Sequence, residues 1–109
     1  MTVKIKPEVY DYLENLVIIL FEKGYFCFRE TARKYVDDLL KDIITKLPIR
    51  LKRPAPEYFD KYGKDLKYVV LKKNKNTQWY AFFSQYKEKG EIIYLVCYIA
   101  NNHEVAQYL

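Results

Sequence analysis

The hydrophobic period changes from helical to strand-like in the middle of the chain, and this change limits the possible folds more than any other feature. From Val9 to Leu47, apolar residues recur every three or four positions, which predicts amphipathic helices. After Gly63, β-branched and aromatic residues dominate three short segments, and this pattern predicts strands. Helices followed by strands within 109 residues, the size of one domain, indicate a single α+β domain covering residues 1–109.

Both expected helices carry end signals. Pro7 and Glu8 suit a first helical turn, and Gly24 suits the stop of that helix. The second helix is expected from Phe28 to Leu47. It should end there because Pro48 follows, and the residue before a proline disfavours helical backbone. Only a few residues separate the two helices, so we expect an antiparallel helical hairpin.

The expected strands flank this hairpin in the sequence. Residues 2–6 alternate in polarity as a short strand does, and residues 48–63 read as a basic, proline-containing loop without regular structure. The segments DLKYVVLKK, TQWYAFFSQY and EIIYLVCYIA follow, joined by short polar connections typical of antiparallel neighbours. The predicted architecture is β-α-α-β-β-β, an antiparallel sheet with a helical hairpin packed on one face.

Both faces of the expected sheet are rich in apolar and aromatic residues. Strict alternation places Cys97 with Ile99 on one face, and Val96 with Tyr98 on the other. Since the hairpin covers only one face, we expect exposed aromatic rings on the second face.

Positive charge is concentrated in the middle of the chain. Residues 46–75 carry ten Lys or Arg and three Asp or Glu, whereas the flanking segments are each slightly acidic. A local basic surface of this kind suits contact with phosphates, although basic loops also serve solubility.

The sequence lacks most signatures of enzymes and membrane proteins. It contains no phosphate-binding glycine loop, no serine-hydrolase elbow and no zinc-protease motif. Its single histidine and two isolated cysteines, Cys27 and Cys97, are too few for a zinc site, and we expect both cysteines to be buried reduced thiols. No apolar run suits a membrane span or a secretion signal. We therefore expect a soluble cytoplasmic protein without a metal, a cofactor or a membrane partner.

A basic loop, a lysine cluster, aromatic residues and one terminal imidazole remain, and these are components of an RNA site. Metal-independent RNA cleavage needs a base for the 2′-hydroxyl, an acid for the 5′-oxygen and cations for the phosphate. Aromatic rings add surfaces on which bases stack.

Three segments, LKYVVLKK, WYAFF and YLVCYIANNH, together with the expected order of elements, resemble the RelE/ParE superfamily of bacterial toxins. The resemblance covers nearly the whole chain in layout. It implies a toxin that a cognate antitoxin holds inactive. RelE-type members cut messenger RNA inside the ribosome, whereas ParE-type members poison DNA gyrase.

Only part of the family's site carries over. His103 corresponds to the family's histidine after the last strand, and Tyr108 lies near a late tyrosine found in many members. Nuclease members often have Arg where this chain has Tyr80; the matching place in the preceding strand is Val70, with Lys72 one pleat further on. All four arginines lie in the first half of the chain. Lysine cannot hold a phosphate with the planar fork of arginine, which weakens the case for a nuclease.

Nine residues form the candidate site. The expected catalytic groups are His103, Lys72 and Tyr108, with RNA-binding roles for Lys52, Arg53, Lys67, Lys73, Lys75 and Trp79. The histidine, the lysine cluster and the tryptophan each have a plainer interpretation: a surface or capping histidine, a soluble lysine-rich turn, and a tryptophan of the core or of a protein interface. The aromatic strand residues could equally line a groove for the antitoxin.

The leading hypothesis is a ribosome-dependent mRNA endonuclease toxin of a type II toxin-antitoxin pair. The alternative is a non-nucleolytic binding module, such as a ParE-type inhibitor of DNA gyrase. Catalysis requires His103 and the central cations to converge on one side of the sheet.

Overall fold

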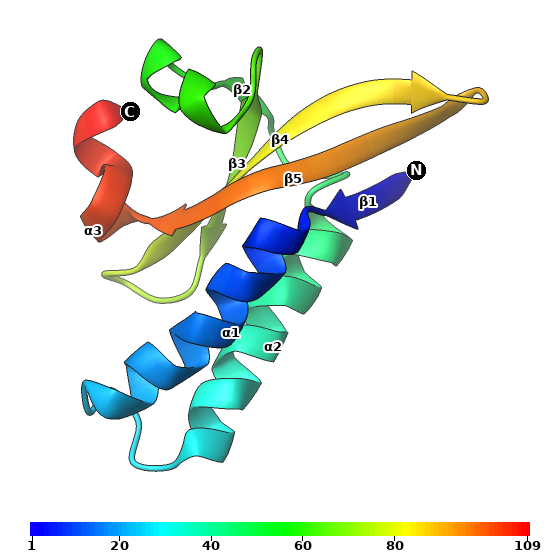
Figure 1. Cartoon of the computed structure of the whole chain (residues 1–109). Coiled ribbons are helices and arrows are strands. Elements are labelled where there is room, and N and C mark those ends of the chain that lie inside the picture. Colours follow the sequence, from blue (N-terminus) through cyan, green and yellow to red (C-terminus); the bar gives the residue numbers. More distant parts are fainter.

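The computed structural model describes all 109 residues, Met1 to Leu109, and has an α+β fold. A five-stranded sheet has the order β1-β5-β4-β3-β2. The strands are β1 (Thr2–Ile5), β2 (Arg53–Pro54), β3 (Lys67–Lys72), β4 (Gln78–Glu88) and β5 (Glu91–Asn101). Helices α1 (Pro7–Glu22) and α2 (Arg29–Lys46) form a hairpin on one face of this sheet, as the sequence predicted (Figure 1).

The sheet is mixed, which corrects the expectation of a wholly antiparallel one. β3, β4 and β5 are consecutive antiparallel neighbours, but β1 pairs in parallel with β5, with Val3 opposite Tyr94. The bond from the Lys6 amide to the Val96 carbonyl continues this pairing to the start of α1. The two helices between β1 and the later strands provide the long connection that parallel pairing needs, so β1 can fill the free edge of β5.

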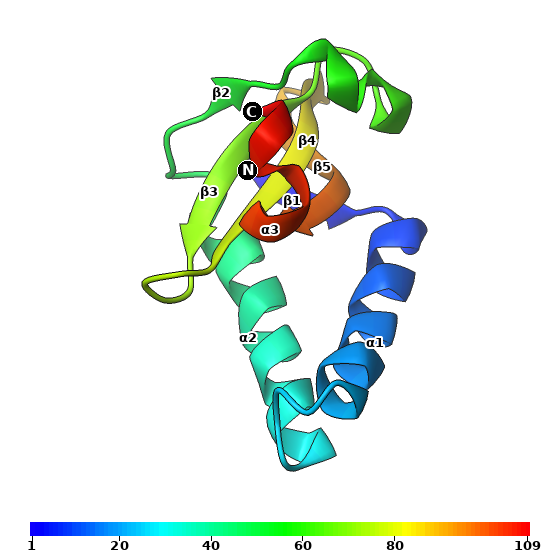
Figure 2. The same ribbon diagram turned by 90° about the vertical axis from the view of Figure 1, so that its left-hand side faces the viewer.

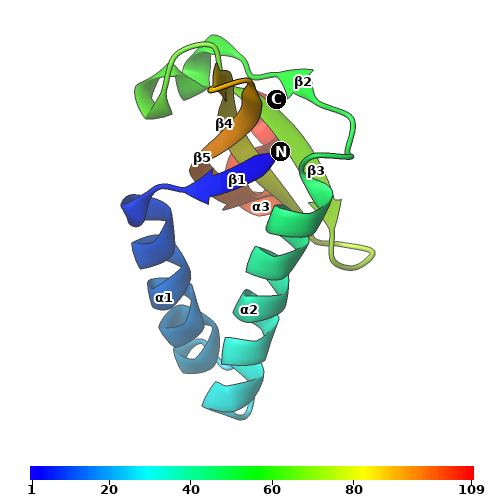
Figure 3. The same ribbon diagram turned by 90° about the vertical axis from the view of Figure 1, so that its right-hand side faces the viewer.

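The hairpin is stabilised by two apolar stripes and by one ion pair. The buried stripes are Val9, Leu13, Leu16 and Val17 on α1, and Ala32, Val36, Leu39 and Ile43 on α2. Arg33 donates two hydrogen bonds of 2.7 Å to the Glu14 carboxylate across the pair. Gly24 has φ +77°, and the amides of Gly24 and Tyr25 bond back to Phe21 and Leu20, so the expected stop of α1 is confirmed. Figures 2 and 3 show that the helices are closest at this loop and diverge toward the sheet.

The second face of the sheet is covered, and this corrects the expectation of exposed rings. The basic segment contains β2 and a 3-10 helix, η1 (Glu57–Tyr62), where the sequence suggested only an irregular loop. Phe59 of η1 stacks on Phe82 of β4 with centroids 4.3 Å apart, and Val105 from the C-terminal segment joins the same cluster. A second apolar core therefore lies opposite the helical hairpin.

A β-bulge changes which faces the β5 side chains occupy. Phe82 pairs with Tyr98 but Phe83 pairs with Val96, so the register slips by one residue at Cys97. Val96 and Ile99 consequently lie in the core beneath the helices, while Cys97 and Tyr98 pack against the second core. Strict alternation was wrong for this strand because a bulge adds one residue to it.

Both cysteines are free thiols, but their burial differs from the expectation. Cys27 lies exposed in the loop between α1 and α2, and Cys97 is half-buried. Neither helix has the length and apolarity needed to cross a bilayer.

Candidate functional site

His103 lies on a short helix, α3 (Asn102–Val105), that starts where β5 ends. The side chain of Asn101 accepts a hydrogen bond from the Glu104 amide at 3.1 Å, and the Glu104 carboxylate accepts one from the Asn101 amide at 3.4 Å. Asn102 accepts a bond from the Gln78 amide at 3.0 Å and donates one to the Asn76 carbonyl at 3.2 Å. These amide contacts hold α3 against the β3–β4 turn and leave the His103 side chain exposed.

A cavity of about 590 Å³ separates α3 and the β3–β4 turn from α1. His103 and Trp79 both line it, so the structure brings two of the nine candidate residues to one place. The other lining residues come from the helical hairpin, the turn and the start of α3: Tyr12, Leu16, Ile19, Leu20, Lys23, Tyr25, Phe26, Tyr35, Asn74, Thr77, Asn101 and Glu104. The cavity is mainly aromatic and aliphatic, with a few polar groups, which is the usual composition of a ligand pocket.

The carboxylate of Glu104 is the acidic group of this cavity. Its Oε1 atom accepts a bond from the Tyr12 hydroxyl at 3.4 Å as well as the bond from the Asn101 amide, while Oε2 has no partner in the protein. Burial raises the pKa of Tyr12 well above its usual value, and the Glu104 charge raises it further. Tyr12 therefore stays protonated and holds Glu104 as a hydrogen-bond donor, with one carboxylate oxygen free.

Trp79 is a core residue, so the predicted base stacking does not fit its position. Its side chain is 2% exposed, and its Nε1 donates a hydrogen bond of 3.0 Å to the Tyr35 hydroxyl of α2. No face of the ring is open to a base.

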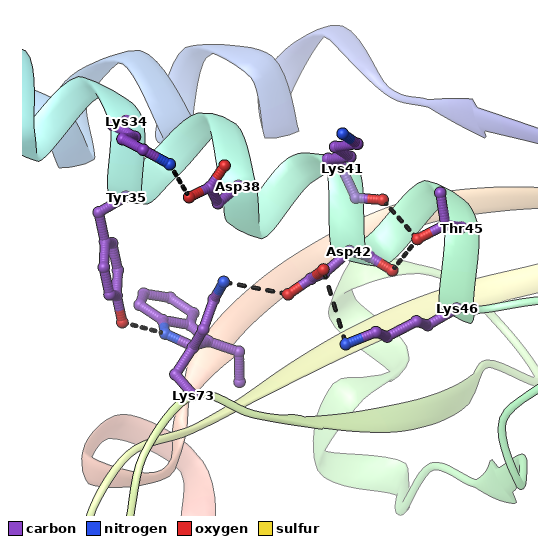
Figure 4. A network of polar contacts seen from close by, with 9 residues as sticks. Lys34, Tyr35, Asp38, Lys41, Asp42, Thr45, Lys46 and Lys73 are labelled. Atoms are coloured by element: carbon purple, nitrogen blue, oxygen red, sulfur yellow. Dashed lines mark hydrogen bonds and ion pairs between the residues drawn. The ribbon is translucent and has the colours of Figure 1, made fainter.

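Lys73 lies beside the same wall but is engaged in an ion pair (Figure 4). Its Nζ donates a hydrogen bond of 3.0 Å to Asp42 of α2 and lies 5.6 Å from the centre of the Tyr35 ring. Burial raises the pKa of Asp42, but the bond from Lys73 and the charges of Lys73 and Lys46 outweigh this effect and hold the pKa below its usual value. Lys73, with a side chain only 15% exposed, thus links β3 to α2 and is not free for a phosphate.

The remaining predicted cations do not gather at the cavity, so the structure does not bring the central cations together with His103 as the expected site required. Lys67 is the first residue of β3 and Lys73 directly follows its last, so the two lie roughly 20 Å apart along the strand direction. Lys52 lies near Lys67: burial lowers its pKa, and the Lys67 charge lowers it further. Arg53 lies opposite Tyr68, a residue of the second core, and Lys72 lies on the same face of β3 as Tyr68. Both cations therefore point away from the hairpin. Lys75 is exposed in the β3–β4 turn.

Tyr108 belongs to a different cluster. It lies in the 3-10 helix η2 (Ala106–Tyr108) and stacks on Tyr58 of η1 with ring centroids 3.6 Å apart. Its hydrogen bond with Tyr58 raises the pKa of Tyr108, whereas bonds from Lys61 and Tyr108 lower the pKa of Tyr58. Tyr108 therefore packs with η1 and does not line the cavity that holds His103.

Sequence reasoning missed several groups at this site. Glu104 stands three residues after Asn101, a spacing typical of a capping box, and that signal was available in the sequence. Lys23, Tyr12 and Tyr25 come from the α1 side, and no local pattern connects them with His103. No cluster of three or more His, Cys, Asp or Glu side chains is placed to hold a metal ion.

Comparison of the chain with protein-family models, with curated proteins and with solved structures gives no match.

Proposed function

We propose that this chain is a RelE/ParE-type toxin of a type II toxin-antitoxin pair that cuts messenger RNA in the ribosome without a metal ion. The order of elements supports the proposal: a short strand, a helical hairpin, a basic segment and three antiparallel strands, with a histidine directly after the last strand. The segments that resemble the family lie on β3, β4, β5 and the start of α3.

One observation carries the catalytic part of the proposal. His103, which has an exposed imidazole, and Glu104, which has a free carboxylate oxygen, both line the cavity, and Lys23 adds a cation. An imidazole and a carboxylate are a sufficient acid and base for cleavage at a ribose 2′-hydroxyl.

The proposed reaction is an internal transesterification. Glu104 takes the proton from the 2′-hydroxyl, the O2′–P bond forms, and the P–O5′ bond breaks. Protonated His103 delivers a proton to the departing 5′-oxygen, and Lys23 stabilises the charge on the non-bridging oxygens. The products are a 2′,3′-cyclic phosphate and a 5′-hydroxyl end. Lys72 and Tyr108 have no part in this step, because they pack on the second face of the sheet.

The test uses two variants in translating ribosomes. Glu104→Gln removes the base but keeps a side chain that suits the capping box, so α3 should still form. Both Glu104→Gln and His103→Asn should lower the rate of message cleavage by about 10²- to 10⁴-fold. The exposed substitution Lys87→Gln, on the distal end of β4, is the matched control and should cut like the wild type.

Gyrase inhibition is the second candidate, and one observation favours it. None of the four arginines lines the cavity; Arg33, for example, is bound to Glu14. The cavity therefore lacks the bidentate phosphate group that arginine supplies. A gyrase poison predicts DNA damage in expressing cells and survival of cells with a resistant gyrase.

The antitoxin supplies a separate test of the toxin class. A neighbouring gene product that rescues growth on coexpression would support this class. If wild-type protein cuts no message in translating ribosomes and His103→Asn remains fully toxic, the nuclease proposal is wrong.

A further inference from the structure

We infer that the cavity beside His103 is a pocket for one unstacked uracil-like base of the RNA strand, a base whose edge presents carbonyl oxygens. The inference rests on the proposed function and adds to it the class of base that the site selects. It concerns the aromatic and amide walls of the cavity, which the cleavage step does not use.

The dimensions of the cavity suit a nucleotide. Its volume of about 590 Å³ falls within the range of about 300 to 1,000 Å³ that is typical of small-ligand pockets. His103, Glu104 and Lys23 lie at the same cavity, so a base inside it would have its own ribose and phosphate near these groups.

Aromatic rings form the part of the wall contributed by the hairpin. Phe26 and Tyr35 pack against each other with ring centroids 5.5 Å apart. Tyr25 is 70% exposed in the loop after α1 and makes no ring contact within the protein. A large exposed ring beside an aromatic wall is suited to stacking on a base, and such stacking is the main way in which proteins bind single-stranded RNA.

The opposite wall offers hydrogen-bond donors. The side-chain oxygens of Asn74 and Asn101 accept hydrogen bonds from backbone amides, at 2.9 Å and 3.1 Å. Their Nδ2 groups have no acceptor in the protein. On the hairpin wall, the Tyr35 hydroxyl accepts a bond from Trp79 and keeps its own hydrogen free. Asn74, Asn101 and Tyr35 thus bring to the cavity donors that have no acceptor in the protein, while the Glu104 carboxylate serves the cleavage step. Uracil offers two carbonyl acceptors and one N–H donor, whereas cytosine offers one carbonyl oxygen, one ring nitrogen and an amino group with two donor hydrogens, so uracil leaves fewer donors without a partner.

Trp79 provides a direct measurement, because it is the only tryptophan and its side chain lines the cavity. Oligouridylate and oligocytidylate of equal length are added to the free protein, and the fluorescence of Trp79 is followed while the anisotropy of labelled RNA reports total binding. We expect oligouridylate to quench Trp79, with an apparent affinity about threefold or more above that of oligocytidylate, as the loss of one hydrogen bond implies. Free uridine 3′-monophosphate should quench as well, only more weakly, because the pocket recognises a single nucleotide.

Two matched variants separate the cavity from the rest of the surface. Tyr25→Ala removes the exposed ring at the cavity. It should lower the affinity for oligouridylate, measured by Trp79 quenching, by about fivefold or more, as the loss of one stacking contact implies. Tyr86→Ala removes another exposed ring, 40% exposed, on the distal part of β4 and away from the cavity, and should leave quenching unchanged. The inference is overturned if RNA binds without quenching, if cytosine is preferred, or if the two variants behave alike.

The result can be distinguished from failure of the proposed function. Base binding is measured on the free protein, whereas cleavage is measured in ribosomes with His103→Asn. If His103→Asn abolishes cleavage while Trp79 does not respond to RNA, the nuclease proposal stands and the base pocket is wrong.

Discussion

Three amide side chains determine how His103 is presented. Asn101 caps α3, Asn102 ties it to the β3–β4 turn, and Asn74 shapes that turn by accepting bonds from the amides of Asn76 and Thr77. Because α3 has only one turn, it depends on these contacts and not on helix propensity. The position of the imidazole therefore follows from neighbouring amides, while the imidazole itself remains unbonded and exposed.

We predict that Tyr35→Phe destabilises the protein by about 1 to 3 kcal/mol, because it leaves the Nε1 group of the buried Trp79 without an acceptor. Urea denaturation followed by Trp79 fluorescence measures the loss. Tyr10→Phe removes a hydroxyl from an exposed tyrosine of α1 and should change the free energy of unfolding by less than about 0.5 kcal/mol. Equal effects of the two substitutions would mean that the Trp79–Tyr35 bond does not form.

At the scale of elements, two short segments cover the second face of the sheet. η1 contributes Phe59, and the C-terminal segment contributes Val105, to the cluster around Phe82. The stack of Tyr58 on Tyr108 joins these segments to each other. Two elements of only one or two turns thus act as a second layer, because each supplies apolar side chains to the same core.

Phe59→Ala should destabilise the protein by about 3 to 5 kcal/mol, since Phe59 is fully buried and its loss leaves a cavity against Phe82. Chemical denaturation measures the free energy of unfolding of this variant and of Tyr86→Ala, a control at an exposed tyrosine. A loss below about 1 kcal/mol would show that η1 does not cover the sheet in solution.

The ion pair between Lys73 and Asp42 connects the end of β3 to α2, and it should make stability depend on pH. Asp42 has a folded-state pKa below the ordinary value of 3.8, so its contribution is complete at pH values well above 3.8. As the pH falls below 3.8 and through the folded-state pKa, Asp42 becomes protonated and the contribution is lost. Asp42→Asn should therefore be less stable than the wild type at neutral pH and should approach it near pH 2. A stability difference that stays constant over this range would rule out the ion pair as its cause.

At the scale of the whole molecule, the positive charge is spread over both faces and both ends of β3. Lys67 and Lys52 lie at one end, Lys73 is neutralised at the other, and Arg53 faces the second core. A single phosphate cannot touch these cations together. RNA bound at the cavity would meet Lys23 and His103 instead.

The dependence of RNA binding on salt tests this arrangement. Each phosphate contact on a single strand contributes roughly −0.7 to the slope of the logarithm of affinity against the logarithm of salt concentration. Contacts from Lys23 and His103 alone therefore predict a slope of about −1.4. Titration of oligouridylate at several salt concentrations provides the slope. A slope steeper than about −4 would indicate that RNA follows the basic segment of residues 46–75 and not the cavity.

Local patterns were enough to predict the two long helices and the strands β1, β3, β4 and β5, but not β2 or the short helices. The 3.6-residue period, Pro7 and Gly24 defined α1, and the following run up to Pro48 defined α2. Alternating β-rich runs defined β3, β4 and β5, and their short connections predicted antiparallel pairing. These features depend on residues close together in the chain, so the sequence alone carries them.

The tertiary structure decided how those elements share their faces. The parallel pairing of β1, the bulge at Cys97, the cover provided by η1 and the burial of Trp79 all involve residues far apart in the chain. The meeting of His103 with Lys23 and Tyr25 is of the same kind. Sequence periodicity shows that a side chain is apolar or charged on a given face, but packing between distant segments determines what covers that face. The sequence therefore determined the α+β layout, and only the tertiary structure determined which side chains share a cavity with the single imidazole.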